Sequence, residues 1–74
     1  MVVTIKLFAH FRRGRFKETL QVLPPGTICG EVLAALGLEA GEAGIVLVNG
    51  RHADLGRELS DRDTLSLFPL VGGG

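Results

Sequence analysis

Only one segment of this 74-residue sequence has apolar residues at helical spacing, and it is about ten residues long. It follows the stop formed by Pro24-Pro25-Gly26, with Thr27 as the predicted N-cap and Gly37 as the residue that ends it. The apolar stripe consists of Ile28, Val32, Ala35 and Leu36, bordered by Cys29 and Leu33. Because so short a helix is unstable alone, it must pack on a sheet built from the rest of the chain.

Two strands are predicted before the helix. Apolar and polar residues alternate over residues 2–8, with Val3, Ile5 and Leu7 on one face. The alternation breaks from His10 to Gly14, where Gly14 supplies the backbone freedom that a hairpin needs. A second strand is then expected to return antiparallel to the first. The side chains predicted to face inward from it are Phe16, Leu20 and Val22.

Three strands are predicted after the helix. Residues 45–48 are an unbroken apolar run, typical of a strand that is central in a sheet or covered on both faces. Asn49-Gly50 strongly favours a tight hairpin, so residues 51–53 should turn back as a brief strand. Residues 64–68 form the last strand, with Leu65 and Leu67 facing inward. Its pairing should end near Pro69, because proline has no N–H to donate.

This order of elements predicts an α+β domain, the β-grasp (ubiquitin-like) roll, with a mixed sheet of four to five strands and one main helix packed on one face. Residues 1–71 are expected to form the domain, and residues 72–74 a flexible glycine tail that can approach another surface closely. In this arrangement the first and last strands are neighbours in the middle of the sheet.

Two aromatic residues fall on the face away from the helix when the strands are counted with a period of two. They are Phe8 and Phe68, which would lie on adjacent strands at the base of the tail. We expect the two rings to form a patch that docks a partner protein. The alternatives are that a loop covers them, or that a bulge turns one of them inward.

Composition excludes several classes of function. The single cysteine, Cys29, rules out a disulfide framework and any four-cysteine metal or iron–sulfur site. It lies where a helix dipole would lower the pKa of a thiol, but it also borders the apolar stripe and is better explained as a buried small residue. His10 and His52 have no second ligand at metal spacing, so no metal site is expected.

Neither a membrane span nor a signal peptide is recognisable, so a cytoplasmic location is expected. The net formal charge is zero, which argues against a general nucleic-acid binder. Five bases nevertheless precede the first acid, Glu18, and eight acids but only three bases follow from there. Such polarity is suited to orienting a protein partner. The basic run at residues 12–15 could instead contact phosphate or RNA, but no aromatic platform accompanies it.

Taken together, these features resemble the MoaD/ThiS-like sulfur carriers, the family that includes the small subunit of molybdopterin synthase and the carrier for the thiazole ring of thiamine. The resemblance covers the whole chain. It rests on Thr27-Ile28, Leu36-Gly37-Leu38, Leu47-Val48-Asn49-Gly50, Leu59-x-Asp61-x-Asp63-x-Leu65 and the closing Phe68-Pro69-Leu70-Val71-Gly72-Gly73-Gly74. Synthase subunits typically end Phe-Pro-Pro-Val-Ala-Gly-Gly, so Leu70 and Gly72 depart from that pattern. Val-Gly-Gly-Gly endings also occur in thiazole-type carriers.

The resemblance implies a defined chemistry. A ubiquitin-activating-like adenylyltransferase uses ATP to adenylate the Gly74 carboxylate, and a sulfur donor system converts it to a thiocarboxylate. Gly72 and Gly73 thread into this enzyme. The carrier then delivers sulfur to a second partner, the large subunit of molybdopterin synthase or, on the other branch, thiazole synthase. The residues implied in partner binding are Phe8, Phe68, Pro69, Leu70 and Val71.

The chain itself is expected to bind no cofactor or metal and to lack intrinsic catalysis, since no nucleophile–base pair is recognisable. The alternative from a different class is a ubiquitin-like protein modifier or interaction module without sulfur chemistry.

Overall fold

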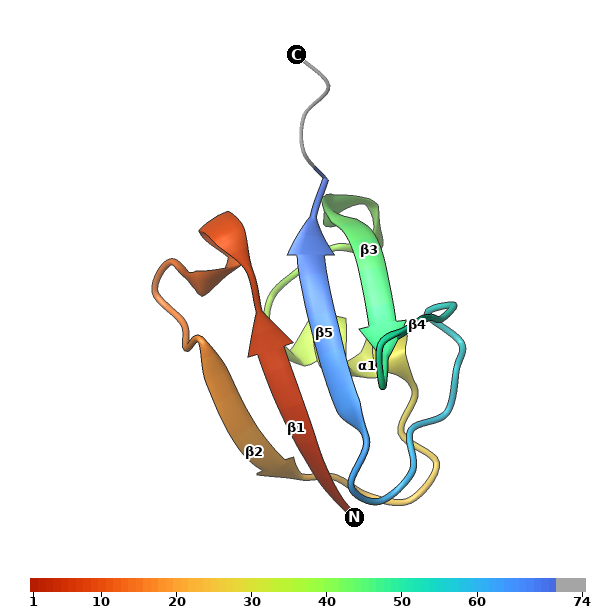
Figure 1. The fold of residues 1–74 in the computed structure, drawn as a ribbon. Helices are drawn as coiled ribbons and strands as arrows, with labels where there is room; N and C mark the ends of the chain where they lie inside the picture. The colour runs from red at the N-terminus through yellow and green to blue at the C-terminus, as the bar shows by residue number, and fades with distance from the viewer. Residues whose placement is uncertain (71–74) are drawn as a thin grey trace.

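The computed structural model describes residues 1–70. The predicted boundary between domain and tail, at residue 71, lies outside the described residues. The described chain forms one five-stranded sheet of order β2-β1-β5-β3-β4 (Figure 1). Its elements are β1 (Val2–Leu7), the 3₁₀ turn η1 (Ala9–Arg12), β2 (Glu18–Val22), α1 (Cys29–Ala35), the 3₁₀ turn η2 (Ala40–Glu42), β3 (Ala43–Val48), β4 (Arg51–His52) and β5 (Thr64–Pro69). β1 and β5 are parallel, whereas all other neighbours are antiparallel. The predicted β-grasp arrangement is confirmed.

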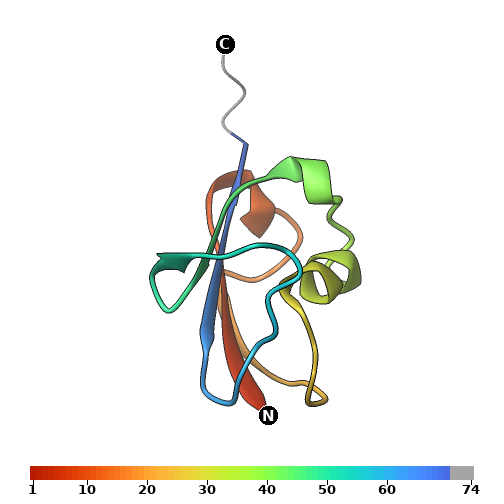
Figure 2. The same ribbon diagram turned by 90° about the vertical axis from the view of Figure 1, so that its right-hand side faces the viewer.

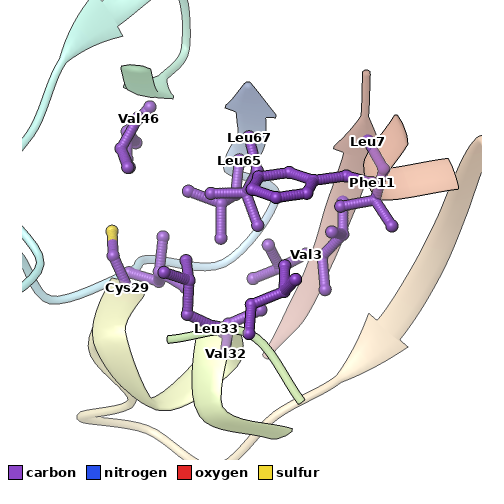
Figure 3. Close-up of a cluster of buried hydrophobic side chains, with 13 residues drawn as sticks. Val3, Leu7, Phe11, Cys29, Val32, Leu33, Val46, Leu65 and Leu67 are labelled. Carbon is purple, nitrogen blue, oxygen red and sulfur yellow. The ribbon is translucent and has the colours of Figure 1, made fainter. Parts of the chain in front are cut away.

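The core lies between α1 and one face of the sheet, as the view along the sheet edge shows (Figure 2). The two central strands supply alternate side chains to it, among them Val3 and Leu7 from β1 and Leu65 and Leu67 from β5, all fully buried (Figure 3). These inward faces are the ones that the alternation predicted. No helix of residues 1–70 covers the opposite face of the sheet.

The helix is shorter than predicted and begins later. It has seven residues rather than about ten, and Thr27 is not its N-cap, since its hydroxyl donates to the carbonyl of Pro24 (2.7 Å). The N–H groups of Cys29 and Gly30 instead donate to backbone carbonyls of the loop before β5, at 3.0 and 2.7 Å. The first N–H groups of the helix are therefore hydrogen-bonded by this loop instead of by a capping side chain.

The buried stripe of the helix is also rotated relative to the prediction. Cys29, Val32 and Leu33 are the buried residues, while Ala35 is exposed and Leu36 only partly buried. The three buried residues still share one face of the helix, at spacing i, i+3, i+4. Two of them, Cys29 and Leu33, had been predicted to border the apolar stripe.

The predicted second strand is present and antiparallel to β1, but the inward face predicted for Leu20 and Val22 is wrong. Leu20 and Val22 are 68% and 82% exposed and lie on the open face of the sheet. A backbone hydrogen bond from Leu7 N–H to Lys17 O (2.9 Å) fixes the register, so the odd-numbered residues of β2 share the side of Leu7 and the even-numbered residues face away. Phe16 precedes the strand and packs partly buried against the core.

The unbroken apolar run in β3 is covered on one face only. Val46 and Val48 are buried, whereas Ile45 is 42% exposed on the open face. The hairpin that follows is confirmed, with Asn49 and Gly50 both at positive φ (53° and 81°). The Asn49 amide group donates to the buried carboxylate of Asp63 (2.8 Å), which ties this turn to the start of β5.

Phe11, Leu38 and Leu59 belong to the core although the sequence analysis did not place them there, and Phe11 is the largest of them. Phe11 lies in the segment where alternation breaks, yet its ring is only 1% exposed. The η1 turn produces this, because Phe8 O accepts from Phe11 N–H (3.2 Å) and Ala9 adopts φ = 51°, folding the chain back over the end of the core.

We therefore predict that Phe11→Ala lowers the free energy of unfolding by about 3–5 kcal/mol, the usual cost of deleting a buried aromatic ring. Chemical denaturation with urea measures this. Arg13→Ala is the matched control, since Arg13 is exposed at the end of the same turn, and it should change stability by less than about 0.5 kcal/mol. Equal effects of the two substitutions would show that η1 does not close the core.

Candidate functional site

Two aromatic rings meet on the open face of the sheet. Phe8 follows β1 directly and Phe68 lies in β5, so the parallel pairing of these strands brings the rings side by side. They are stacked with centroids 4.1 Å apart and planes 10° from parallel, and each is partly buried. The predicted placement away from the helix is thus confirmed, and within residues 1–70 no bulge turns either ring inward.

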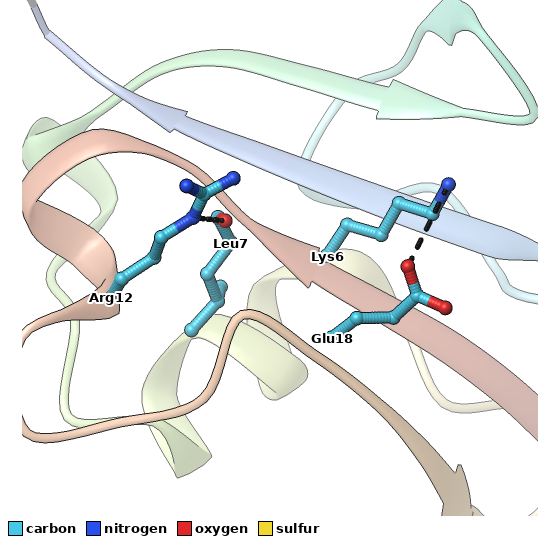
Figure 4. Close-up of polar contacts among 4 residues, drawn as sticks. All are labelled: Lys6, Leu7, Arg12 and Glu18. Atoms are coloured by element: carbon cyan, nitrogen blue, oxygen red, sulfur yellow. Dashed lines mark hydrogen bonds and ion pairs between the residues drawn. The ribbon is translucent and has the colours of Figure 1, made fainter.

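An arginine covers the outer side of this pair. The η1 turn brings Arg12 back so that its Nε donates to the carbonyl of Leu7 (2.7 Å; Figure 4). The guanidinium carbon then lies 5.3 Å from the centroid of Phe8. The result is a three-layer stack of Arg12, Phe8 and Phe68, in which a cation over the ring adds an electrostatic attraction. The sequence analysis considered Arg12 only as part of the basic run at residues 12–15 and did not predict this contact.

Two further apolar side chains extend the surface. Ile45 pairs with Phe68 across β3 and β5, and Leu70 follows β5 directly and is 57% exposed. We call the set Phe8, Ile45, Phe68 and Leu70 the β5-end patch. Ile45 was not predicted to belong to it, because its position depends on the cross-strand register. Apolar side chains gathered on an otherwise open sheet face are typical of a protein-binding surface.

The backbone at the end of β5 is held firmly up to Leu70. Pro69 is buried and pairs with Ala43, so the exposed part of the site does not include it. A bulge in β3 inserts Gly44, where an added Cβ would lie 2.9 Å from Leu70 Cα. Leu70 N–H also donates to the carbonyl of Glu42 (2.9 Å). The predicted site residues that come next, Val71, Gly72, Gly73 and Gly74, lie outside the described residues.

Opposite charges flank the end of β5. On one side is the η1 turn, which follows β1 and carries Arg12 and then Arg13. On the other side is the η2 turn, which precedes β3 and carries Glu42, with Glu39 just before it (Figure 1). The uneven charge seen in the sequence is therefore displayed across the site. Such a dipolar rim favours one orientation of an approaching protein.

The other candidate groups take no part in this site. Cys29 is buried in the core, and burial raises the pKa of its thiol, an effect larger than the opposing attraction of Arg57. It is therefore protonated at neutral pH and inert. Over residues 1–70 no three His, Cys, Asp or Glu side chains are grouped closely enough to hold a metal ion. Within the same range no helix is long and apolar enough to cross a membrane.

Residues 5–74 match the model of the ThiS family. The chain belongs to the ThiS family. The match includes every residue of the β5-end patch and extends over the residues after it. A comparison with curated protein sequences finds no significant match.

Several solved structures resemble this ThiS-family chain over nearly its whole length. A Pyrococcus furiosus protein described as molybdopterin converting factor, subunit 1, is 29% identical with a TM-score of 0.77, over 96% of this chain and 99% of that one. SAMP1 of Haloferax volcanii, a small archaeal modifier protein, is 30% identical with a TM-score of 0.76, over the full length of both. Subunit 1 in a complex of subunits 1 and 2 of molybdopterin-converting factor from Helicobacter pylori is 25% identical with a TM-score of 0.63, over both full lengths.

These likenesses confirm the fold and narrow the function to two kinds of protein. The chain is a sulfur carrier of the ThiS/MoaD type or a ubiquitin-like modifier of the small archaeal type. Both kinds are named among relatives that share its length and fold.

The close approach at Gly44 leads to a prediction. Gly44→Ala forces apart the backbones of Gly44 and Leu70, so it should lower the free energy of unfolding by about 1–3 kcal/mol. It should also shift the amide resonance of Leu70. Gly41→Ala is the control, because an added Cβ there meets nothing within 4 Å. Indistinguishable melting curves and Leu70 resonances for the two variants would contradict the geometry.

Proposed function

We propose that this chain is a sulfur carrier. The carboxylate of Gly74 is adenylated and then converted to a thiocarboxylate, which donates sulfur in the synthesis of molybdopterin. The observation that carries the proposal is the partly buried stack of Arg12, Phe8 and Phe68 on the open sheet face at the end of β5, in a chain of the ThiS family. This surface includes Leu70, which stands two positions before the first of the closing glycines, Gly72.

The chemistry needs little from the carrier itself. A carboxylate is a poor electrophile until one of its oxygens becomes a good leaving group. The Gly74 carboxylate therefore attacks the α-phosphorus of ATP and pyrophosphate leaves, giving an acyl adenylate. A sulfur nucleophile then attacks the acyl carbon, and AMP leaves. Glycine at this position presents no Cβ to obstruct the attack. ATP belongs to the activating enzyme, and the carrier binds no cofactor of its own.

The β5-end patch supplies the positioning. An activating enzyme that holds the patch brings the following residues to its nucleotide at high effective concentration. The charged rim of Arg12 and Arg13 on one side and Glu42 on the other favours one orientation.

Two observations favour the molybdopterin branch over the thiazole branch. Phe68-Pro69 matches the ending typical of synthase subunits, and Pro69 here has a structural role in closing the β5 ladder at Ala43. Two of the similar structures are also named molybdopterin converting factor, and one of them is a complex of subunits 1 and 2. We therefore propose a large synthase subunit as the second partner, on the same patch.

A second candidate function has one specific observation in its favour. SAMP1 shares 30% identity with this chain over the full length of both. In that case the Gly74 carboxylate is joined to lysine amines of other proteins. Peptide mapping of cell extracts would then find lysines that carry a Gly-Gly remnant from this chain.

The proposed chemistry predicts a change in intact mass. Incubation with the cognate activating enzyme, ATP and a sulfur source should replace one oxygen of the chain by sulfur, as measured by mass spectrometry. A variant with one residue added after Gly74 should fold normally and remain uncharged, since the attacked carboxylate is displaced. An unchanged mass for the native chain, under conditions that charge a known carrier, would reject the proposal.

The docking role of the patch predicts a separation of binding from stability. Phe68→Asp should weaken binding to the activating enzyme or large subunit by about thirtyfold, about 2 kcal/mol, as expected for an aromatic anchor. Loss of stacking on Phe8 should cost only about 1 kcal/mol of stability. Calorimetric titration and thermal unfolding measure the two.

Ser66→Asp is the matched control, because Ser66 lies on the same face of β5 one row away. It should leave partner affinity nearly unchanged. A similar loss of affinity for both variants would indicate a general charge effect rather than docking through the ring.

A further inference from the structure

A second group of apolar side chains lies on the open face, at the opposite end of β1 from Phe8. It consists of Val2, Leu20 and Val22, which are 40%, 68% and 82% exposed, and we call it the β2-edge patch. Val22 pairs with Val2 and Leu20 pairs with Thr4, so the three side chains share one face.

A polar row separates this patch from the β5-end patch. Glu18, Lys6 and Ser66 lie side by side across β2, β1 and β5, and Lys6 Nζ is 3.9 Å from the Glu18 carboxylate (Figure 4). The two apolar patches are therefore distinct surfaces. The sulfur-carrier function proposed above uses only one of them.

The backbone of β2 is open along the same edge. β2 is the outermost strand beside β1. Its inner bonds to β1 lie at odd-numbered positions, as the bonds from Leu7 N–H to Lys17 O (2.9 Å) and from Leu23 N–H to Met1 O (2.8 Å) show. In an antiparallel ladder the intervening residues point their N–H and C=O groups to the other side. Glu18, Leu20 and Val22 thus present N–H and C=O groups that are free of backbone partners among the described residues. Leu20 O accepts one long hydrogen bond from Thr19 Oγ1 (3.5 Å), and a carbonyl oxygen can accept a second.

The usual protection of a sheet edge is weak here. Edge strands are normally guarded by several charges, a proline or a bulge. Within β2 there is no proline, its ladder with β1 runs without a register shift, and Glu18 is its single charged residue. The two residues with the greatest exposure among the large apolar ones described are Leu20 and Val22, on this strand.

We propose that β2 pairs antiparallel with β2 of a second copy of this chain, centred on Leu20, so that the two sheets join. The three residues with free backbone groups are spaced symmetrically about Leu20. A second copy therefore offers a matching set, with Leu20 opposite Leu20 and Glu18 opposite Val22 of the other copy. No like charges face one another in this register. Leu20 meets Leu20, and the six apolar side chains of the two patches lie on the same face of the joined sheet.

Shifted registers match less well. Moving the pairing centre to Thr19 places Val22 opposite Phe16, which lies outside the strand. Moving it to Gln21 brings in Pro24, which has no N–H to donate. Only the register centred on Leu20 pairs all three open residues of each copy. This self-complementarity favours a second copy over an unrelated segment as the occupant of the edge.

The geometry also sets the strength and the consequences of the contact. Two strands of five residues form an interface smaller than the roughly 1,200 Å² of a stable complex, so dissociation constants of about 0.1–1 mM are expected.

β1 lies between β2 and β5, which leaves the β5-end patch outside the contact. Antiparallel pairing of the β2 strands makes the two β5 strands run in opposite directions, so the two patches lie at opposite ends of the joined sheet.

Sedimentation velocity and amide NMR spectra, recorded over about a hundredfold range of concentration up to about 1 mM, test the proposal. The average mass should rise from monomer toward dimer, the amides of Glu18, Leu20 and Val22 should shift most, and isotope-filtered spectra should show contacts between Leu20 methyl groups of different copies. Leu20→Lys should abolish the rise, with an unchanged melting temperature because Leu20 is largely exposed.

Leu70→Lys is the matched control, since Leu70 is an exposed leucine of the other patch, and it should dimerise like the native chain. A monomer at every concentration would overturn the proposal, even if the β2 amides shift when another protein is added. A dimer lost in Leu70→Lys but kept in Leu20→Lys would also overturn it, by placing the contact on the β5-end patch. Charging of Gly74 by the activating enzyme should be the same in the native chain and Leu20→Lys, so this result is independent of the sulfur-carrier test.

Discussion

The parallel pairing of β1 with β5 is the interaction on which the rest of this structure depends. It joins segments about sixty positions apart, with Ile5 beside Leu65 and Leu7 beside Leu67 at the centre of the core. The same register brings Phe8 against Phe68 on the opposite face. The core and the β5-end patch are therefore two faces of one strand pair. A change that disturbs this pairing alters stability and recognition together, and its long sequence separation makes it a late and slow contact to form.

Where local rules determine a feature, the sequence was sufficient to predict it. Side chains must alternate along a strand, so the inward faces of β1 and β5 and the outward position of Phe8 and Phe68 could be deduced. Asn49-Gly50 specified its hairpin because both residues tolerate positive φ. Family membership also followed from motifs in the order seen here, and the match over residues 5–74 bears it out.

Features that depend on contacts distant in sequence were missed. The face of Leu20 and Val22 is set by a register fixed at Leu7 and Lys17, after a connection whose 3₁₀ turn no periodicity reveals. That turn also buries Phe11 and places Arg12 over Phe8. The first residue of α1 depends on carbonyls of the loop before β5. In the candidate site, the positions of Phe8 and Phe68 therefore follow from strand alternation. The position of Arg12 depends on a turn whose geometry only the folded chain defines.

The anchoring of the chain up to Leu70 has a mechanical consequence. β5 lies between β1 and β3, with hydrogen bonds to both neighbours that run across its length. Traction applied beyond Leu70, along the strand, would load these bonds together in shear rather than open them one after another. An enzyme that pulls on the chain after Leu70 can therefore put it under tension without unfolding the domain, because the hydrogen bonds on both sides of β5 must break together.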